Sequence, residues 1–201
     1  MKIRITQGSL RSLRQALTWA QRALLVSAAV SLAYCAFVYF DAWTYQTRQN
    51  RALDQLPIVE PGTAPRASGL SSIDGLVGRI EIARIGLSVV VAEGVGSKTL
   101  RRAAGHIPGT ALPGHNGNVG IAGHRDTFFR PLEKVRVNDV IVLTSHGIEY
   151  RYRVVFSQVV SPSDVGVLDP TGDDVLTLVT CHPFSFVGPA PNRFIVRAAR
   201  V

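Results

Sequence analysis

Short runs of alternating apolar and polar residues, separated by glycine and proline, fill the C-terminal part of this sequence. The clearest run spans residues 148–160, and its apolar side chains would share one face: Ile148, Tyr150, Tyr152, Val154 and Phe156. A three-residue hairpin loop, Ser145-His146-Gly147, joins it to a predicted strand at 139–144. Further strands are predicted at 78–82, 87–92, 118–122, 176–180 and 194–198. Helical signals are weak and confined to residues 97–104 and 127–133. Many short strands with little helix predict an all-β fold for residues 77–201, a closed or nearly closed barrel.

An apolar segment without charged residues, 23–40, precedes this part of the chain. As a helix it would be about 27 Å long, close to the hydrocarbon thickness of a bilayer. The charged residues before it are all basic: Lys2, Arg4, Arg11, Arg14 and Arg22. The positive-inside rule therefore predicts a cytoplasmic basic N-terminus at 1–22, a transmembrane signal anchor at 23–40 and an extracytoplasmic linker at 41–76. A cleaved signal peptide has the same charge pattern, but no small-x-small cleavage site follows the apolar segment, so a retained anchor is favoured.

The net charge of +8 comes mostly from this N-terminus, because the rest of the chain has 17 basic and 14 acidic side chains. Nucleic-acid binding would require a basic face on the folded domain. The composition therefore predicts a membrane-anchored domain that binds no nucleic acid.

The chain has two cysteines, and only one of them is predicted to lie in the folded domain. Cys35 lies in the apolar segment, so it cannot pair with Cys181, which ends the apolar run at 175–180. An unpaired thiol in an exported domain is either inert or kept as a nucleophile. Two other polar motifs accompany it: Gly123-His124-Arg125 upstream, and Arg193 at the start of an apolar run downstream. Each residue alone has a structural explanation, as a core thiol, a loop histidine or a solvent-exposed arginine.

Taken together, these motifs resemble the sortases, the cysteine transpeptidases of bacterial surfaces. The resemblance covers roughly residues 77–201, including Gly105 to Gly114, and is most specific at Thr177-Leu178-Val179-Thr180-Cys181. The run Thr-Leu-Val-Thr-Cys-x-Pro-Phe is most similar to the sortases of Gram-negative bacteria, in which tyrosine commonly follows the cysteine. Here His182 stands in that place, and a second imidazole beside the nucleophile would change the reactivity of the thiol.

The resemblance implies a closed eight-stranded β-barrel with one or two short helices, preceded by the transmembrane helix. It also implies Cys181 as nucleophile, His124 as general acid and base, and Arg193 as the group that holds the substrate carbonyl. Arg197 competes with Arg193, because residues four apart in a strand share a face. The loops at 161–174 and 182–192 would wall the substrate groove. Contacts with substrate are expected from Thr180, His182 and Phe184, while Phe184, Phe186 and Val187 either contact it or pack the loop.

The implied substrate is a protein with a C-terminal LPxTG-like sorting signal, cleaved between Thr and Gly through a thioester. The acyl group would pass to an amine on the cell surface, and the enzyme would lie in the cytoplasmic membrane with its barrel outside, in the periplasm if the cell is Gram-negative. No cofactor is expected. His106, His115 and His124 recur at nine-residue intervals, but their spacing is not that of metal ligands, so no metal site is predicted. His106 is instead expected to be a structural or rim residue.

Two other functions are compatible with parts of the pattern. One is another cysteine acyl-transferase, such as an L,D-transpeptidase acting on peptidoglycan stem peptides, although that family has its histidine shortly before a Ser-x-Gly-Cys motif. The other is a membrane-tethered, non-catalytic β-barrel binding module, against which the full set of Cys, His and Arg counts. Replacement of Cys181 separates an enzyme from a binding module, because it should abolish turnover in an enzyme and leave the function of a binding module unchanged.

Overall fold

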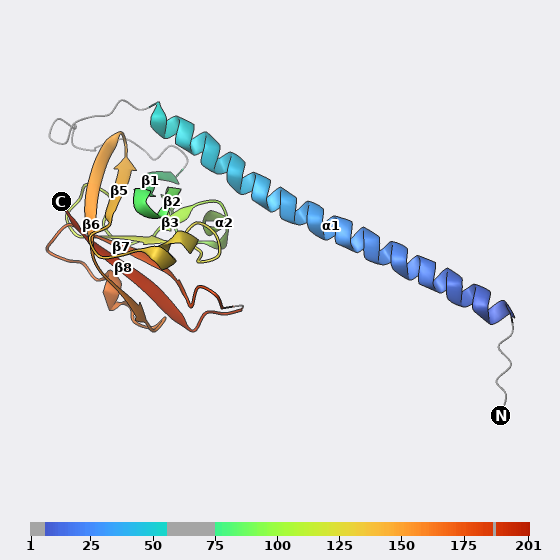
Figure 1. Ribbon diagram of the computed structural model, residues 1–201. Coiled ribbons are helices and arrows are strands. Elements are labelled where there is room, and N and C mark those ends of the chain that lie inside the picture. The colour runs from blue at the N-terminus through green and yellow to red at the C-terminus, as the bar shows by residue number, and fades with distance from the viewer. Residues whose placement is uncertain (1–6, 56–74, 187) are drawn as a thin grey trace. The chain divides into compact units, whose positions relative to one another are not determined.

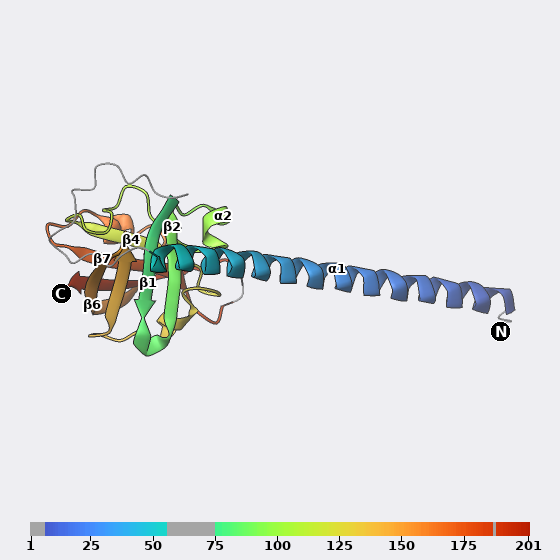
Figure 2. The same cartoon turned by 90° about the horizontal axis from the view of Figure 1, so that it is seen from above.

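A computed structural model describes residues 7–55, 75–186 and 188–201, and within them eight strands close into a barrel (Figures 1 and 2). The eight-stranded barrel predicted from the strand pattern and the resemblance is confirmed. The strands are β1 (Leu76–Ile82), β2 (Leu87–Glu93), β3 (Ala104–His106), β4 (Asn118–Ala122), β5 (Val140–Ser145), β6 (Ile148–Val160), β7 (Val175–His182) and β8 (Asn192–Arg200). Short helical turns connect some of them: η2 (Ala83–Ile85), α2 (Ser97–Leu100), η3 (Arg130–Lys134) and η4 (Val165–Leu168).

The strands follow the order β1-β2-β3-β4-β7-β8-β6-β5 around the barrel. Two neighbouring pairs are parallel, β2 with β3 and β4 with β7, while the other pairs are antiparallel. A parallel pair needs a long crossover, and here β5 and β6 lie between β4 and β7 in the sequence. Residues far apart in the chain therefore meet at the ends of β4 and β7.

Alternation along the strands decides which side chains fill the barrel. In β7, Leu176 and Leu178 belong to the buried core, and in β8, Val196 and Ala198 do. The residues between them point outward, because successive strand residues face opposite sides of a sheet. The outer face of β7 therefore includes Thr177, Val179 and Cys181.

Two details of the hairpin between β5 and β6 differ from the prediction. Ser145 pairs with Ile148, so the loop has two residues, His146 and Gly147, and not three. Both have positive φ, 51° and 78°, as the type I′ turn favoured in two-residue hairpins requires. The predicted alternation of β6 holds through Val154 and then breaks at a register shift between Val154 and Phe156, which leaves Phe156 39% exposed.

β3 was not predicted, because its first residue, Ala104, ends the weak helical signal at 97–104 and only two further residues follow it in the strand. The helix there is limited to Ser97–Leu100, and the chain then enters β3, which pairs with β2 and β4. The second predicted helical segment, 127–133, forms a turn followed by η3.

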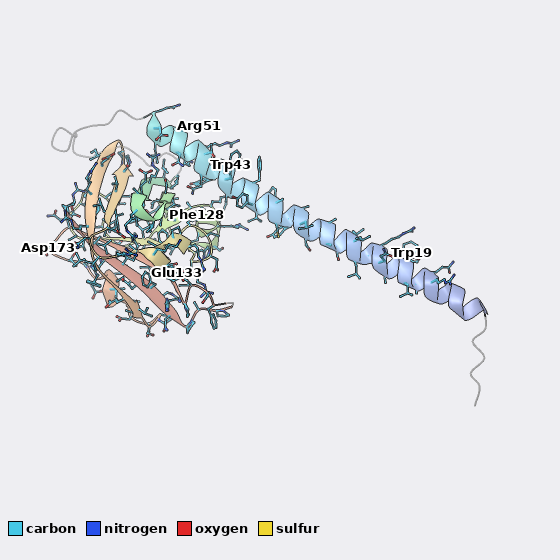
Figure 3. All side chains as sticks on the ribbon, in the orientation of Figure 1. Trp19, Trp43, Arg51, Phe128, Glu133 and Asp173 are labelled. Atoms are coloured by element: carbon cyan, nitrogen blue, oxygen red, sulfur yellow. The ribbon has the colours of Figure 1, made fainter. Side chains whose placement is uncertain are left out.

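The N-terminal region forms one continuous helix, α1 (Gln7–Asp54). Within the described residues, it is the helix whose length and composition suit a membrane span, over Arg14–Asp54. Trp19 and Trp43 project from it with 69% and 57% of their surface exposed (Figure 3). A single apolar helix of this kind is compatible with the predicted membrane anchor.

The last turns of α1 lie in a segment that the sequence predicted as linker. The chain divides into two compact units, 1–41 and 42–201, so these turns belong to the same unit as the barrel. The Gln46 side chain donates to Arg102 O at 2.7 Å and accepts from Val90 N at 3.0 Å, and Leu53 packs against Leu76 and Val90. Residues 42–54 contain no glycine or proline, which explains why the helix persists. Most of the proline-bearing part of the predicted linker, 56–74, lies outside the described residues.

Candidate active site

The three residues proposed for chemistry lie at one end of three neighbouring strands. Cys181 and Arg193 are direct partners in the antiparallel register of β7 and β8. Directly opposite residues have Cβ atoms about 4.5–5.5 Å apart on the same face of a sheet. The thiol of Cys181 is unpaired and half-buried, and Arg193 is also half-buried.

His124 reaches the same level from β4. Ala122 of β4 is the partner of Val179 of β7, and the contact continues through Gly123 N, which donates to Val179 O at 3.1 Å. Extending this parallel register by two residues brings His124 level with Cys181. The His124 ring is exposed, and within the described residues it makes no hydrogen bond, so both ring nitrogens are available to exchange a proton.

The guanidinium of Arg193 is only partly used by the protein. Its Nη1 donates to Ala190 O at 3.3 Å and to Asn192 O at 3.0 Å. In the described part of the chain, Nε and Nη2 have no partner. These donors are available for a substrate carbonyl beside Cys181.

Arg197, the competing arginine, lies two pairs further along the same face, opposite Thr177. Its Nη2 donates to Val167 O at 2.7 Å, in η4. Burial lowers the pKa of Arg197. The register therefore favours Arg193 over Arg197 as the arginine nearest the thiol.

The three expected substrate-contacting residues lie behind Cys181. The Thr180 hydroxyl is buried and donates to Gly123 O at 2.8 Å. The His182 ring stacks on Phe194, with centroids 6.2 Å apart, and meets the edge of Phe184 at 6.0 Å. Phe184 belongs to the barrel core and is 6% exposed. The Thr180 and His182 side chains alternate with that of Cys181 along β7, and Phe184 packs in the core, so the geometry favours a supporting role over direct contact with substrate.

Two segments border the outer face of β4 and β7. The loop that contains η4 is attached by Asn118, whose Nδ2 donates to Val167 O at 3.1 Å and to Asp169 O at 3.2 Å. Thr110 lies on the other side and accepts from Gly120 N at 3.1 Å. A Cβ at Gly120 would lie 2.9 Å from Thr110 Cγ2 and 3.1 Å from Leu168 Cδ2, so both segments converge over this glycine.

His106 supports the Thr110 segment from beneath, as expected of a structural residue. It is 2% exposed, with Nδ1 2.8 Å from Glu93 Oε2 and Nε2 3.0 Å from Ala111 O. His115 and His124 are both exposed. Among the residues that the structure describes, no group of three or more His, Cys, Asp or Glu side chains is placed to hold a metal ion.

The sequence assigned no role to Arg125, although it follows His124 directly. Its guanidinium is buried and donates to Pro183 O at 3.0 Å, Phe186 O at 2.6 Å and Gly188 O at 2.9 Å, all in the loop between β7 and β8. Arg130 of η3 donates to Phe184 O in the same loop. Phe128 and Glu133, labelled in Figure 3, belong to the connection between β4 and β5 that also carries Arg125 and Arg130. The sequence signal for the burial of Arg125 was the alternation of side chains, because a residue next to an outward-facing His124 faces inward. Val187, an expected apolar contact, lies outside the described residues.

Comparisons with known proteins identify the family of the barrel. Residues 80–201 match the sortase domain. Sortase D of Bacillus subtilis is 34% identical over 126 residues, which cover 62% of this chain and 63% of that protein. The chain therefore spans less than two thirds of the length of this relative.

Solved structures give the same result. A sortase D5 transpeptidase of Clostridium perfringens superposes with a TM-score of 0.57 and 35% identity, covering 63% of this chain and 79% of that one. Sortase C1 of Streptococcus agalactiae superposes with a TM-score of 0.60 and 31% identity, covering 66% and 70%. With its closed barrel and the match over residues 80–201, this chain belongs to the sortase family of cysteine transpeptidases.

Proposed function

We propose that this protein is a membrane-anchored sortase that cleaves an LPxTG-like sorting signal between Thr and Gly and transfers the acyl group to an amine at the cell surface. The observation that carries the proposal is the register of three strands: Cys181 lies opposite Arg193, and β4 brings His124 to the same level. A nucleophile, a proton carrier and an oxyanion donor are the three groups that thiol-based acyl transfer needs.

In the first half-reaction, the Cys181 Sγ–H proton passes to the His124 imidazole, and the thiolate attacks the Thr carbonyl carbon. Arg193 donates to the carbonyl oxygen as negative charge develops there. The C–N bond then breaks, the imidazolium protonates the departing amine of Gly, and a thioester remains on Cys181.

In the second half-reaction, the acceptor amine attacks the thioester and loses a proton to His124. The C–S bond breaks, an amide forms, and the Cys181 sulfur regains a proton. The sorting signal would lie against the outer face of β4 and β7 near Cys181, walled by the loops at 161–174 and 182–192. Thr180, His182 and Phe184 would fix the ends of β7 and β8 from the core side.

The arrangement along the chain follows from the charge pattern of the N-terminus. We propose residues 1–22 in the cytoplasm, 23–40 in the cytoplasmic membrane, 41–76 as an extracytoplasmic connection whose first part is helical, and 77–201 as the catalytic barrel. The resemblance implies that the substrate is itself held in this membrane by a C-terminal hydrophobic tail. Anchoring the enzyme and the substrate in the same membrane raises their effective concentration. Added protease on spheroplasts should remove the barrel, and an intact barrel would contradict this topology.

The finer class also remains a proposal. The run Thr177 to Phe184 favours the class found in Gram-negative bacteria, whereas the similar proteins described above come from Gram-positive bacteria. Substrate preference would decide between the classes.

Mass spectrometry of the full-length protein in detergent tests the function directly. The protein is incubated with a panel of LPxTG-like peptides and a small amine, beside Cys181→Ala, His124→Ala, Arg193→Met and Arg197→Met. We expect a cut between Thr and Gly, a thioester on Cys181 and an amide product, all absent from Cys181→Ala. Arg193→Met should lose about 10²–10³-fold in kcat, as removal of an oxyanion donor does, and Arg197→Met much less. Peptide binding without any cut would instead support a binding module, and cleavage of peptidoglycan stem peptides alone would support the other acyl-transferase.

A further inference from the structure

The side chain of Arg125 is a buried cation outside the proposed chemistry. Its side chain is 6% exposed, and among the described residues its carboxylate partner is Asp126, 3.3 Å away on a side chain that is 70% exposed. Burying a guanidinium is costly unless its donors are matched. Three backbone carbonyls match them here, those of Pro183, Phe186 and Gly188.

Those carbonyls belong to the loop between β7 and β8, whose described residues form no strand pairs. The loop between β7 and β8 carries several prolines, and carbonyls outside a ladder receive no hydrogen bond from a neighbouring strand. Arg125 supplies a donor at three points, and its guanidinium carbon also lies 5.8 Å from the centroid of the Phe186 ring. Arg125 therefore ties three carbonyls of this loop to the segment of His124, and Arg130 ties a fourth, Phe184 O, to η3.

The ends of the clamped loop are the residues proposed for chemistry. Cys181 precedes the loop on β7, Arg193 follows it on β8, and Arg125 itself is bonded to His124 through the backbone. We propose that Arg125 is a positioning residue, which ties the segment of His124 to the loop between Cys181 and Arg193 and so fixes the three groups relative to one another. This inference rests on the proposed function.

A positioning role and a merely structural role predict different losses. If Arg125 only stabilises the fold, its removal lowers stability and leaves the kcat of the folded fraction intact. If it positions the site, kcat falls in the folded protein, because a displacement of about 1 Å can cost about 10²-fold in rate. The KM would change little, since the outer face of β4 and β7 is untouched.

The experiment compares Arg125→Met and Arg125→Lys with Arg79→Met in the full-length protein in detergent. Arg79 is a matched control, because it is a partly buried, ion-paired arginine on β1, on the far side of the strand order from β7. kcat and KM are measured with the cleaved peptide, and amide hydrogen exchange is measured in parallel. We expect Arg125→Met to lose about 10²-fold in kcat with KM within about threefold. Arg125→Lys should recover only part of the loss, because its ammonium group donates from a single point and cannot reach all three carbonyls.

Hydrogen exchange gives a second measurement that does not depend on turnover. In Arg125→Met, exchange should accelerate at the amides of the β7–β8 loop and not in β1 and β2, whereas Arg79→Met leaves that loop unchanged. If Arg125→Met fails to fold, Arg125→Lys gives the same comparison with a smaller expected loss.

A kcat of Arg125→Met or Arg125→Lys equal to wild type, or an unchanged exchange rate in the loop, would overturn the positioning role. If wild type cleaves no peptide of the panel, the proposed function fails, and exchange alone then decides whether Arg125 holds the loop.

Discussion

Gly123, the residue before His124, is the position where one added carbon atom should test the geometry of the site most sharply. A Cβ there would lie 2.7 Å from both Cγ and Cδ2 of Phe129. Phe129 is fully buried in the core, so its ring has no free space to move into. The backbone is also held, because Gly123 N donates to Val179 O and Gly123 O accepts from Thr180.

The size of the effect follows from that overlap. Ordinary contact begins at 3.4 Å, so Gly123→Ala requires a shift of about 0.7 Å in the ring or in the end of β4. Overpacking of this kind costs about 1–3 kcal/mol, and the loss of glycine freedom in the unfolded chain offsets about 0.4–1 kcal/mol. We expect a net loss of about 1–2 kcal/mol, or about 3–8 °C in Tm. The kcat should fall about tenfold, because His124 moves with the end of β4.

The assay is urea denaturation of the variant together with its kcat. Gly96→Ala is the matched control, since a Cβ at Gly96 has no atom within 4 Å and its φ of −65° suits alanine. This control should change stability by no more than about 0.5 kcal/mol, because the loss of glycine at the N-cap of α2 is offset by the lower entropy of the unfolded chain. In a Phe129→Leu background, Gly123→Ala should cost about 1 kcal/mol less, because the ring is gone. An equal cost in both backgrounds would refute the reasoning.

Three further variants test other contacts by urea denaturation. The Arg84 side chain, by hydrogen bonding to Asp139, lowers the pKa of that carboxyl, so its stabilising effect should be complete above about pH 4 and be lost as the pH falls further. Asp139→Asn should therefore differ from wild type in stability at pH 5 and less at pH 3, and a constant difference would contradict this pair. Asn118→Ala should cost about 1–3 kcal/mol, because it leaves the buried Thr177 hydroxyl without its acceptor at 2.6 Å. Gln46→Ala should cost about 1–2 kcal/mol through the two backbone groups it binds, and an unchanged stability would mean that the last turns of α1 contribute nothing to the barrel.

The strands marked by alternation or by a continuous apolar run were predictable from the sequence, and the short strand β3 was not. Residues 118–122 and 148–160 were predicted with the bounds that the structure gives β4 and β6. β3 has only three residues, too few for a period, and pairs with strands on both sides, so its formation depends on β2 and β4. The break in β6 likewise arises from a bulge opposite β8, a register effect that no local pattern contains.

The candidate site was predictable as a set of residues and not as an arrangement. Alternation alone placed Arg193 and Arg197 on one face, and the register of β7 and β8 was needed to put Arg193 opposite Cys181. The role of Arg125 was hidden for a similar reason, because its partners are backbone carbonyls in a loop. Every residue has a backbone carbonyl, so the sequence does not show which carbonyls accept a hydrogen bond, whereas it shows every thiol and imidazole. The catalytic roles of Cys181, His124 and Arg193 remain predictions.

The distance in sequence between His124 and Cys181 is a consequence of parallel pairing. The carboxyl ends of two neighbouring strands lie at the same edge of a sheet only if the strands run in the same direction. A parallel connection of this kind needs a long crossover. β4 and β7 meet this condition, with β5 and β6 inserted between them, so the residues at their carboxyl ends come together at one rim. β8 returns antiparallel to β7, so its first residues reach the same rim. Because the inward side chains of these strands fill the core, the outward ones can carry reactive groups without disturbing its packing. The strand order thus determines which positions are available for chemistry, and local contacts such as those of Arg125 determine how firmly they are held.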